Sequence, residues 1–268
     1  MQFCGKAPGS SQPAFPAFEV TPSVRRLTVV IPTFNEAENL EAIAKDLWSL
    51  GISGMRILIV DDASPDGTGA LADRLADQHP GRVSVIHRPG KLGLGSAYIT
   101  GFKQALGDGA QAVAQMDADF SHSPSYLPDF VEHLEQSDVV LGSRYVAGAK
   151  LDERWGAGRV LLSRWGNFYA RTILGLQVKD TTGGFRVWRS ETLSGMPLDT
   201  VRSNGYLFQV EMAYVAQRLG YRMLERPIYF EDRRIGQSKM SMGIQIEAAL
   251  RIWQVLLIHR GLRPTRAR

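Results

Sequence analysis

The feature that most constrains the fold is a regular alternation of apolar runs and amphipathic stretches between residues 27 and 144. LTVVIPTF, residues 27–34, is apolar and β-branched almost throughout, as expected for a strand that is buried on both faces. The next stretch, 36–50, places its apolar residues on one helical face. The same reasoning predicts strands at 55–64, 83–88, 110–117 and 137–144, and helices at 68–79, 95–106 and 123–135. This alternation predicts an α/β fold with an open, mostly parallel sheet and helices on both faces.

The pattern changes after residue 144. Helices are expected at 158–174, 207–219 and 242–259, with a glycine-bearing turn at 179–188 that enters a strand and a further strand at 221–231. The first 24 residues are rich in Pro, Gly, Ser and Ala, which is typical of a disordered tail. The sequence therefore predicts three parts, a tail (1–24), an α/β domain (25–241), and an amphipathic helix with a basic tail (242–268).

Positive charge gathers at the C-terminus. The net charge is +4, and the segment from Arg251 to Arg268 contains five arginines and no acidic residue. Such a segment suits nucleic acid, an anionic membrane surface or a solvated terminus. Nucleic acid is the least favoured partner, because the sequence shows no basic face with interleaved aromatic residues.

Cysteine content and hydropathy restrict where in the cell the protein is expected. Cys4 is the only cysteine, so no internal disulfide is expected, and a reducing, cytoplasmic location fits. The best candidate for a membrane span, residues 244–258, is interrupted by Glu247 and Arg251 and falls short of the roughly 18 apolar residues required. The N-terminus has no signal-peptide pattern.

Polar residues follow each predicted strand of the first half, and two acids, Asp117 and Asp119, follow the strand at 110–117. Ligands bind at the carboxyl ends of the strands in open α/β sheets. Two carboxylates there suit Mg²⁺ or Mn²⁺, which take oxygen ligands and keep open positions for water and phosphate. Acid–base chemistry and helix capping are the alternatives, whereas a zinc site is not expected because His122 stands alone.

A glycine-rich loop, Lys91-x-Gly93-x-Gly95, follows the third predicted strand. It fails the dinucleotide-binding pattern, because Tyr98 occupies the third glycine position and the loop does not follow the first strand. A nicotinamide enzyme is therefore not expected. Lys91 remains a candidate for lining a nucleotide pocket, with a flexible turn as the alternative.

Seven motifs occur in order: IPTFNEAENL, VDDASPDGT, KLGLGSAY, MDADFSHSP, GSRY, TTGGFR and DRRIGQSK. Together they resemble the dolichol-phosphate (polyprenol-phosphate) mannosyltransferases of glycosyltransferase family 2, which have the GT-A fold. The resemblance covers about residues 26–240. It implies inverting transfer of mannose from GDP-mannose to a polyprenyl phosphate.

Carried over by position, the resemblance implies a role for each of several residues. The guanosine would contact Pro32, Phe34, Glu36, Val60 and Asp62. The diphosphate would be held by Asp117, Ala118 and Asp119 through Mg²⁺ or Mn²⁺, and the phosphates of donor and acceptor would be lined by Arg144, Arg233 and Lys239. Phe34 stands where relatives often carry Tyr, and Ser121 where some carry Gln. The residues expected to act in catalysis are Asp119 and Arg144.

The chemistry of such a transfer fits the residues present. A phosphate monoester is largely dianionic at pH 7, so it attacks without a strong general base. The sequence offers no Ser/His/Asp or Cys/His set, in agreement with that mechanism. Arg159 and Ser163 are four residues apart on a predicted helix and are candidates, with Arg144, for binding the acceptor phosphate.

A lipid acceptor requires contact with a membrane. Apolar and aromatic residues from Leu161 to Leu174 lie beside arginines, and residues 244–258 carry Trp253 before the basic tail. Both stretches are typical of interfacial helices, although core packing explains either. We expect peripheral attachment at the cytoplasmic face of a membrane, with docking onto an integral membrane protein as an alternative. The competing functions are a UDP-glucose-dependent polyprenyl-phosphate glucosyltransferase and a non-catalytic nucleotide-sugar binding module.

Overall fold

The structure is a computed structural model that describes residues 24–231 and 242–264, with the backbone alone described over 242–248. The predicted tail, except for Val24, and the sites Arg233 and Lys239 lie outside the described residues. So do Cys4 and the last four residues, which include Arg266 and Arg268.

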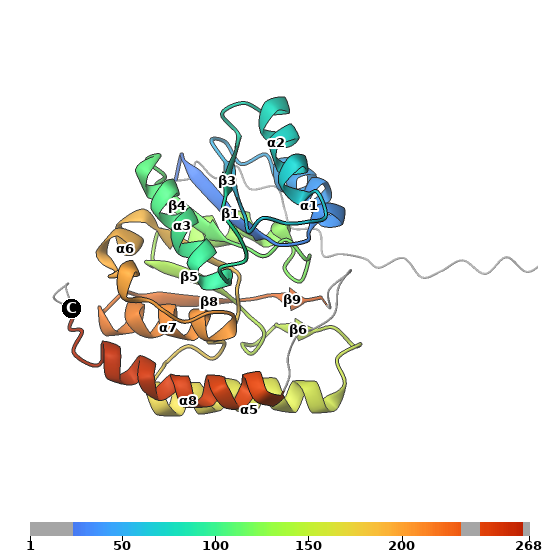
Figure 1. The fold of residues 1–268 in the computed structure, drawn as a ribbon. Helices are drawn as coiled ribbons and strands as arrows, with labels where there is room; N and C mark the ends of the chain where they lie inside the picture. The colour runs from blue at the N-terminus through green and yellow to red at the C-terminus, as the bar shows by residue number, and fades with distance from the viewer. Residues whose placement is uncertain (1–23, 232–241, 265–268) are drawn as a thin grey trace, which may run out of the picture.

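The described chain forms a seven-stranded sheet covered by helices on both faces (Figure 1). The strands of this sheet are β1 (Leu27–Thr33), β2 (Arg56–Asp61), β3 (Val83–His87), β4 (Ala112–Gln115), β5 (Val139–Ser143), β7 (Arg186–Arg189) and β8 (Met223–Pro227). Their order is β3-β2-β1-β4-β7-β5-β8. All neighbouring pairs are parallel except those that β7 makes with β4 and β5. The predicted α/β class with a mostly parallel sheet is confirmed.

The helices pack as two layers around this sheet. They are α1 (Ala37–Ser49), α2 (Thr68–Gln78), α3 (Leu94–Gly107), α4 (Leu127–His133), α5 (Ala157–Leu174), α6 (Ser190–Gly195), α7 (Tyr206–Arg218) and α8 (Met242–His259). Side chains that alternate along β1 point to opposite faces, so Val29 and Ile31 join the core beneath α1, α2 and α4. Val30 joins the other core, which α3, α5, α7 and α8 cover.

Close packing of α3 on the sheet depends on Gly101. A Cβ atom at this position would lie 2.3 Å from Cγ1 of Val30 and 3.2 Å from Cγ2 of Val60. Only a residue without a side chain lets the helix approach this closely. The loop before α3 reaches the segment after β2, where the N–H groups of Leu92 and Gly93 donate to Asp62.

Most predicted elements are confirmed, and the differences have local causes. The predicted strand 221–231 divides into β8 and β9 (Tyr229–Phe230), which pairs with a short strand not predicted, β6 (Lys150–Leu151). The division follows Pro227, which has no N–H for continued pairing. The helix predicted to start at Ser123 begins with a 3₁₀ turn, Pro124–Tyr126, and Ser123 caps it by accepting a hydrogen bond from the N–H of Ser125. Helix α6 and a second 3₁₀ turn, Leu198–Thr200, were also not predicted.

The C-terminal helix shares the core of the domain. Ile252 and Val255 of α8 are buried in the same cluster as residues of α5 and α7. Helices α5 and α8 lie side by side on the outside of this layer (Figure 1). Among the described residues, no helix is both long enough and apolar enough to cross a bilayer.

Candidate active site

Three loops at one edge of the sheet are held in an unusual backbone conformation. Asn35, Ala63 and Phe120, which follow β1, β2 and β4, have φ angles of 62°, 54° and 59°. Residues other than glycine adopt this left-handed region at an energetic cost, and such residues cluster at functional sites. The edge is the carboxyl end of the parallel strands, where the sequence predicts the site.

The residues expected around the nucleoside lie together at this edge. Pro32 and Val60 are direct partners in the pairing of β1 with β2. Phe34 is half-buried, and the ammonium of Lys91 lies 3.9 Å from the centre of its ring. The N–H of Glu36 donates to Oγ1 of Thr68, which fixes the start of α1 beside α2.

Asp62 holds the glycine-rich loop in place. Its carboxylate is nearly buried, and Oδ2 accepts hydrogen bonds from the N–H groups of Leu92 and Gly93 at 3.1 and 3.3 Å. Oδ1 lies 3.0 Å from Nη1 of Arg88, whose side chain is equally buried. The sequence analysis did not assign Arg88 to the site. Its position directly after β3, at the same edge of the sheet, could have indicated such a role.

Asp117 is oriented by a buried tyrosine. The hydroxyl of Tyr98 on α3 donates a 2.6 Å hydrogen bond to Oδ1 of Asp117. Burial, together with the charge and hydrogen bond of Asp117, raises the pKa of Tyr98 well above its ordinary value, so the phenol stays protonated and remains a donor. Tyr98, noticed in the sequence only as the residue that breaks a glycine pattern, is therefore part of the site.

Asp119 lies two residues farther along the same loop and is nearly buried. Its Oδ1 accepts hydrogen bonds from the N–H and the hydroxyl of Ser121, at 3.1 and 2.5 Å. Ser121 thus fixes the carboxylate, while Ala118 between the two acids is buried in the core. His122 is also buried, and its ring packs against Phe185 and Phe230, as expected for a structural histidine.

The TTGGFR motif forms a turn, residues 180–184, that touches both Asp117 and Arg144. A Cβ atom at Gly184 would lie 3.2 Å from Oδ2 of Asp117, so glycine lets the turn pack close to this carboxylate. At the other end of the turn, Asp180 accepts two 2.7 Å hydrogen bonds from Nε and Nη2 of Arg144. Nη2 also donates to Oγ1 of Thr182 at 2.6 Å.

Arg144 and Asp180 form a buried ion pair. Burial alone would raise the pKa of Asp180, but the charge and hydrogen bonds of Arg144 lower it below its ordinary value. Burial likewise opposes the charge of Arg144, and Asp180 more than offsets this and raises the pKa of the guanidinium. Both groups are therefore charged, and Asp180 fixes the planar guanidinium at the sheet edge.

The two residues predicted to bind the acceptor phosphate lie on the first turns of α5. Ser163 accepts a 2.6 Å hydrogen bond from the hydroxyl of Tyr145, the residue that follows Arg144. The guanidinium of Arg159 lies 3.9 Å from the centre of the Trp155 ring. The structure thus places Ser163 beside the Arg144 segment and stacks Arg159 on an aromatic ring one turn earlier.

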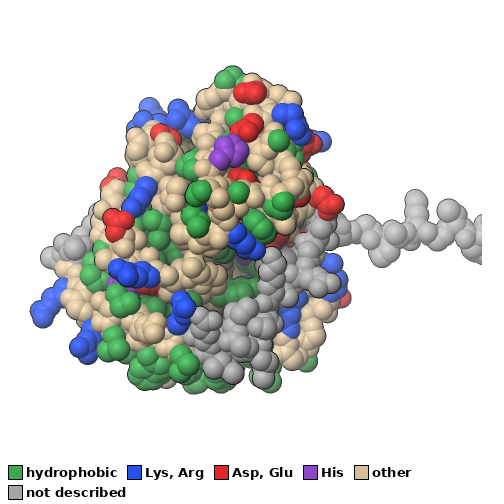
Figure 2. Space-filling view, viewed as in Figure 1, with side chains coloured by type: hydrophobic (Ala, Val, Ile, Leu, Met, Phe, Trp, Pro, Cys, Tyr) green, Lys and Arg blue, Asp and Glu red, His purple; other side chains and the backbone are tan. Residues whose placement is uncertain are grey.

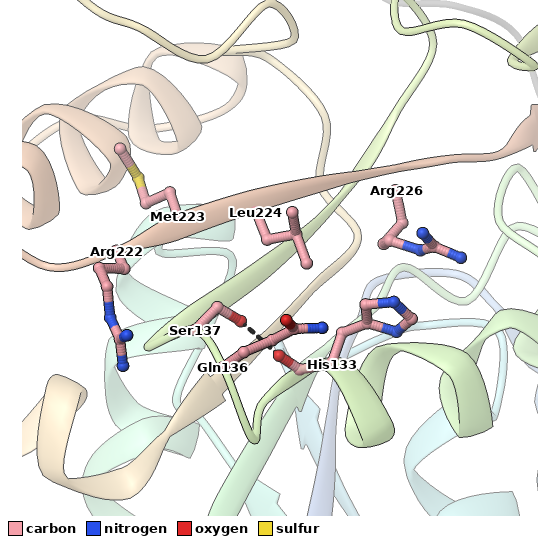
Figure 3. Close-up of a pocket in the computed structure, with 7 residues that line it drawn as sticks. All are labelled: His133, Gln136, Ser137, Arg222, Met223, Leu224 and Arg226. Carbon is pink, nitrogen blue, oxygen red and sulfur yellow. Dashed lines mark hydrogen bonds between the residues drawn. The ribbon is translucent and has the colours of Figure 1, made fainter.

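A cavity of about 370 Å³ lies away from these residues (Figure 3). It is enclosed by the end of α4 and the edge strand β8, and its lining includes His133, Ser137 and Arg222. Ser137 and Arg222 precede β5 and β8, so this cavity lies toward the amino ends of the strands. Ligands of open α/β sheets bind at the opposite edge, and the cavity is therefore not the candidate active site.

Comparison with known proteins agrees with this geometry. The model of the family described as "Glycosyl transferase family 2" matches residues 28–194. The chain belongs to glycosyl transferase family 2. This membership makes it a glycosyltransferase.

Two curated relatives of this family 2 chain are 43% identical to it. The undecaprenyl-phosphate mannosyltransferase of Micrococcus luteus aligns over 240 residues, which are 89% of this chain and 98% of the relative. The polyprenol monophosphomannose synthase of Mycolicibacterium smegmatis aligns over 232 residues, 86% of each protein. The resemblance to polyprenol-phosphate mannosyltransferases that the motifs indicate is confirmed.

Solved structures confirm the GT-A type of fold. A mannosyltransferase from Pyrobaculum calidifontis in complex with GDP-Man and Mn²⁺ superposes with a TM-score of 0.61 at 20% identity, covering 93% of this chain and 69% of the other. Glucosyl-3-phosphoglycerate synthase from Mycobacterium tuberculosis, in complex with Mn²⁺, UDP-glucose and phosphoglyceric acid, gives a TM-score of 0.62 at 18% identity, covering 90% and 82%. At these identities the likeness shows the fold alone.

The strand-end acids fit a divalent cation that is completed by its substrate. Within residues 24–231 and 242–264, no cluster of three or more His, Cys, Asp or Glu side chains forms a self-sufficient metal site. Asp117 and Asp119 supply two carboxylates whose orientation is fixed by Tyr98 and Ser121. Mg²⁺ and Mn²⁺ are commonly held by one or two carboxylates together with phosphate oxygens and water, so the pair fits this class of cation.

Proposed function

We propose that this chain transfers mannose from GDP-mannose to a polyprenyl phosphate, with inversion at the sugar carbon and with Mg²⁺ or Mn²⁺ as its cofactor. The observation that carries the proposal is the 180–184 turn, which touches both Asp117 and Arg144. It joins the carboxylate that we propose binds the metal to the guanidinium that we propose binds phosphate. The proposal is supported by relatives whose names specify mannosyl transfer and polyprenyl phosphates.

In this proposal the strand-end residues bind the donor. Pro32, Phe34, Glu36, Val60 and Asp62 surround the guanosine, and Lys91 reaches the nucleotide from the loop that Asp62 fixes. Asp117 and Asp119 hold the diphosphate through the cation, with Ala118 packing between them. A divalent cation, when bound, neutralises charge that develops on the leaving diphosphate.

Arg144 has two tasks in the proposed reaction. With Arg233 and Lys239, it lines the phosphates, and with Arg159 and Ser163, it holds the acceptor phosphate. Arginine suits this because its fork binds phosphate oxygens in a fixed geometry. Holding two anionic groups in line supplies much of the catalysis, since the acceptor phosphate arrives already deprotonated.

No general base is required by this mechanism. Asp180 is the buried acid next to Arg144, but its oxygens accept hydrogen bonds from Arg144 and from the N–H of Gly183. Its pKa is lowered, which makes it a poor proton acceptor at neutral pH. We assign Asp180 the role of positioning Arg144.

We propose that the α5–α8 layer contacts a membrane that holds the acceptor lipid, at its cytoplasmic face. Leu161 is 70% exposed on α5, and Leu250 is 67% exposed on α8. Trp165 and Trp253 are exposed beside them. Figure 2 shows hydrophobic side chains along the lower edge of the molecule, where Figure 1 places these helices. Apolar and aromatic side chains next to arginines suit the boundary between head groups and acyl chains, and docking onto an integral membrane protein is the alternative use of this surface.

A transfer assay tests the proposal. Purified protein is incubated with GDP-mannose, a polyprenyl phosphate and Mg²⁺ or Mn²⁺, and the mannolipid and released GDP are measured. EDTA should abolish product formation, and added metal should restore it. Turnover of UDP-glucose but not GDP-mannose would overturn the proposed donor, and binding of nucleotide sugar without any turnover would favour a non-catalytic module.

A further inference from the structure

A second cavity, of about 390 Å³, lies between α5 and the segment that follows β5. We call it the basic pocket. Four cationic residues line it: Arg144, Arg164, Arg171 and Lys179. No Asp or Glu is among its lining residues. Sequence reasoning assigned only Arg144 to a site, so the other three cations have no role in the proposed reaction.

Among the described residues, Arg144 is the one cation of the basic pocket in an ion pair, and the nearby carboxylate of Glu225 accepts from the backbone N–H of Lys179. The ion pair with Asp180 neutralises Arg144. In residues 24–231 and 242–264, no ion pair involves Arg164, Arg171 or Lys179. Nε of Arg171 is buried and has no hydrogen-bond partner. Three cations without ion-pair partners in the described chain, around one pocket, favour an anion in it.

The three cations without ion-pair partners in the described part of the chain, Arg164, Arg171 and Lys179, favour a phosphate group as the ligand of the basic pocket. A phosphate monoester carries a charge of about −1.5 to −2 at pH 7 and offers three acceptor oxygens. Two guanidinium groups and an ammonium carry three positive charges, enough to neutralise that charge, and have donors for all three oxygens. Because the pocket is open and three cations surround it, a phosphate fits better than a single carboxylate.

The position of the basic pocket indicates that the phosphate belongs to a lipid. Arg164, Phe168 and Arg171 are spaced four and three residues apart, so they lie on one side of α5. Phe168 lines the pocket and is 65% exposed, and it adjoins the exposed Leu161 and Trp165 on the same helix. The cations therefore border the apolar surface, at the level where head groups would lie if that surface contacts a bilayer.

We propose that the basic pocket binds the phosphate of a membrane lipid. This proposal rests on the proposed lipid acceptor for its location at a bilayer, and it adds a phosphate site made by Arg164, Arg171 and Lys179 next to Arg144. A phosphate group is available from the polyprenyl phosphate, which is a monoester, and from an anionic phospholipid, whose phosphodiester carries a single negative charge and suits the three cations less well. Either would orient the protein so that Arg144 faces the membrane.

The test uses the full chain and vesicle co-sedimentation. The variant Arg164→Gln/Arg171→Gln/Lys179→Gln is compared with Lys45→Gln/Arg56→Gln/Arg74→Gln. The control removes the same charge from exposed positions on α1, β2 and α2. Vesicles contain phosphatidylcholine alone, with polyprenyl phosphate, or with phosphatidylglycerol. Each cation near an anionic bilayer contributes roughly fivefold in affinity, so the pocket variant should bind an anionic vesicle about 100-fold more weakly than wild type.

The vesicle arms separate the two sources of phosphate. A loss confined to polyprenyl phosphate vesicles assigns the pocket to the acceptor, and a loss with phosphatidylglycerol assigns it to phospholipid. Wild-type binding by the pocket variant, or an equal loss in the control, overturns the proposal. If the triple variant does not fold, Arg164→Gln/Lys179→Gln, at two exposed positions, repeats the test. Because binding requires no turnover, failure of mannosyl transfer leaves this result interpretable.

Discussion

The strand-end site and the α5–α8 layer distribute polar and apolar groups in opposite ways. At the strand ends, Asp62, Asp117, Asp119 and Asp180 all accept hydrogen bonds from neighbouring groups. On the outside of α5 and α8, large apolar side chains are exposed, and cations such as Arg164 have no ion-pair partner among the described residues. The acids of the first region are oriented by groups of the protein itself, whereas the second region presents groups that a partner would cover.

This difference matches two different tasks. A charged leaving group requires donors and carboxylates that do not reorganise during the reaction, and buried hydrogen bonds provide this rigidity. A lipid is held in its own phase, so the protein needs only an apolar surface and a phosphate site at the boundary. Substitutions in the first region should therefore alter chemistry, and substitutions in the second should alter membrane binding.

The largest expected effect is that of Asp119→Ala. Removal of this carboxylate should lower kcat for mannosyl transfer about 10³-fold, because the cation that stabilises the leaving diphosphate loses a ligand. Thermal unfolding should change far less than activity, since the hydrogen bonds that Asp119 accepts from Ser121 lie within a single loop. Asp77→Ala, an exposed acid on α2, is the matched control and should retain full activity. Normal activity of Asp119→Ala would refute the metal-binding role.

Asp180→Asn tests how much the buried ion pair between Asp180 and Arg144 stabilises the strand-end site. The change leaves the Arg144 guanidinium buried beside a neutral amide, and loss of a buried partner costs about 3–5 kcal/mol of unfolding free energy. Urea unfolding measures this cost. Asp199→Asn is the matched control, because Asp199 pairs with Lys103 at the surface, where an ion pair contributes less than about 1 kcal/mol. Equal losses of unfolding free energy in the two variants would show that the Arg144–Asp180 pair stabilises the fold no more than a surface ion pair does.

The same pair predicts a pH dependence. The folded-state pKa of Asp180 lies below its ordinary value of about 3.9. Its stabilisation is therefore fully present above about pH 4 and is lost as pH falls through the lowered folded-state pKa. Asp180→Asn removes this contribution, so its unfolding free energy should fall less steeply than that of wild type in acid. Parallel curves for the two proteins between pH 5 and 2 would contradict this assignment.

A smaller effect is expected for Tyr98→Phe. The ring would keep its stacking on Phe208, with centroids 5.8 Å apart, while Oδ1 of Asp117 would lose the hydrogen bond from the Tyr98 hydroxyl. Groups that orient metal ligands typically change metal affinity 10–100-fold. Mn²⁺ binding in the presence of GDP, followed by electron paramagnetic resonance, should weaken by about tenfold. Unchanged Mn²⁺ affinity with a lowered melting temperature would show that Tyr98 acts only in packing.

The sequence was sufficient to predict the strand-end acids. Parallel strands bring their carboxyl ends to one edge, so the positions of Asp62, Asp117 and Arg144 follow once the alternation of strands and helices is recognised. The fold of the first half was predictable for the same reason, since each strand and helix there is specified by its own apolar pattern.

The partners of these residues were not predictable from local patterns. Asp180 reaches Arg144 because β7 enters the sheet antiparallel between β4 and β5, which brings the 180–184 turn beside Asp117. No periodicity in residues 179–188 indicates which strands β7 joins. Tyr98 contacts Asp117 because α3 approaches the sheet closely at Gly101, and that contact depends on packing across 19 residues of sequence.

The smallest expected effect concerns the apolar surface itself. Leu161→Ser/Leu257→Ser removes one exposed leucine from each outer helix, at positions 70% and 59% exposed, so the fold should be unaffected. Burial of a leucine side chain in an apolar phase contributes about 1.5–3 kcal/mol at most, and partial insertion yields less. We expect about tenfold weaker binding to vesicles of phosphatidylcholine alone, where the basic pocket contributes least. Tyr229→Ser, at an exposed aromatic residue on β9, is the matched control. The opposite result would be wild-type binding of phosphatidylcholine vesicles by Leu161→Ser/Leu257→Ser, together with weaker binding of anionic vesicles by Arg164→Gln/Lys179→Gln. It would show that membrane attachment is electrostatic and that the apolar surface serves a protein partner.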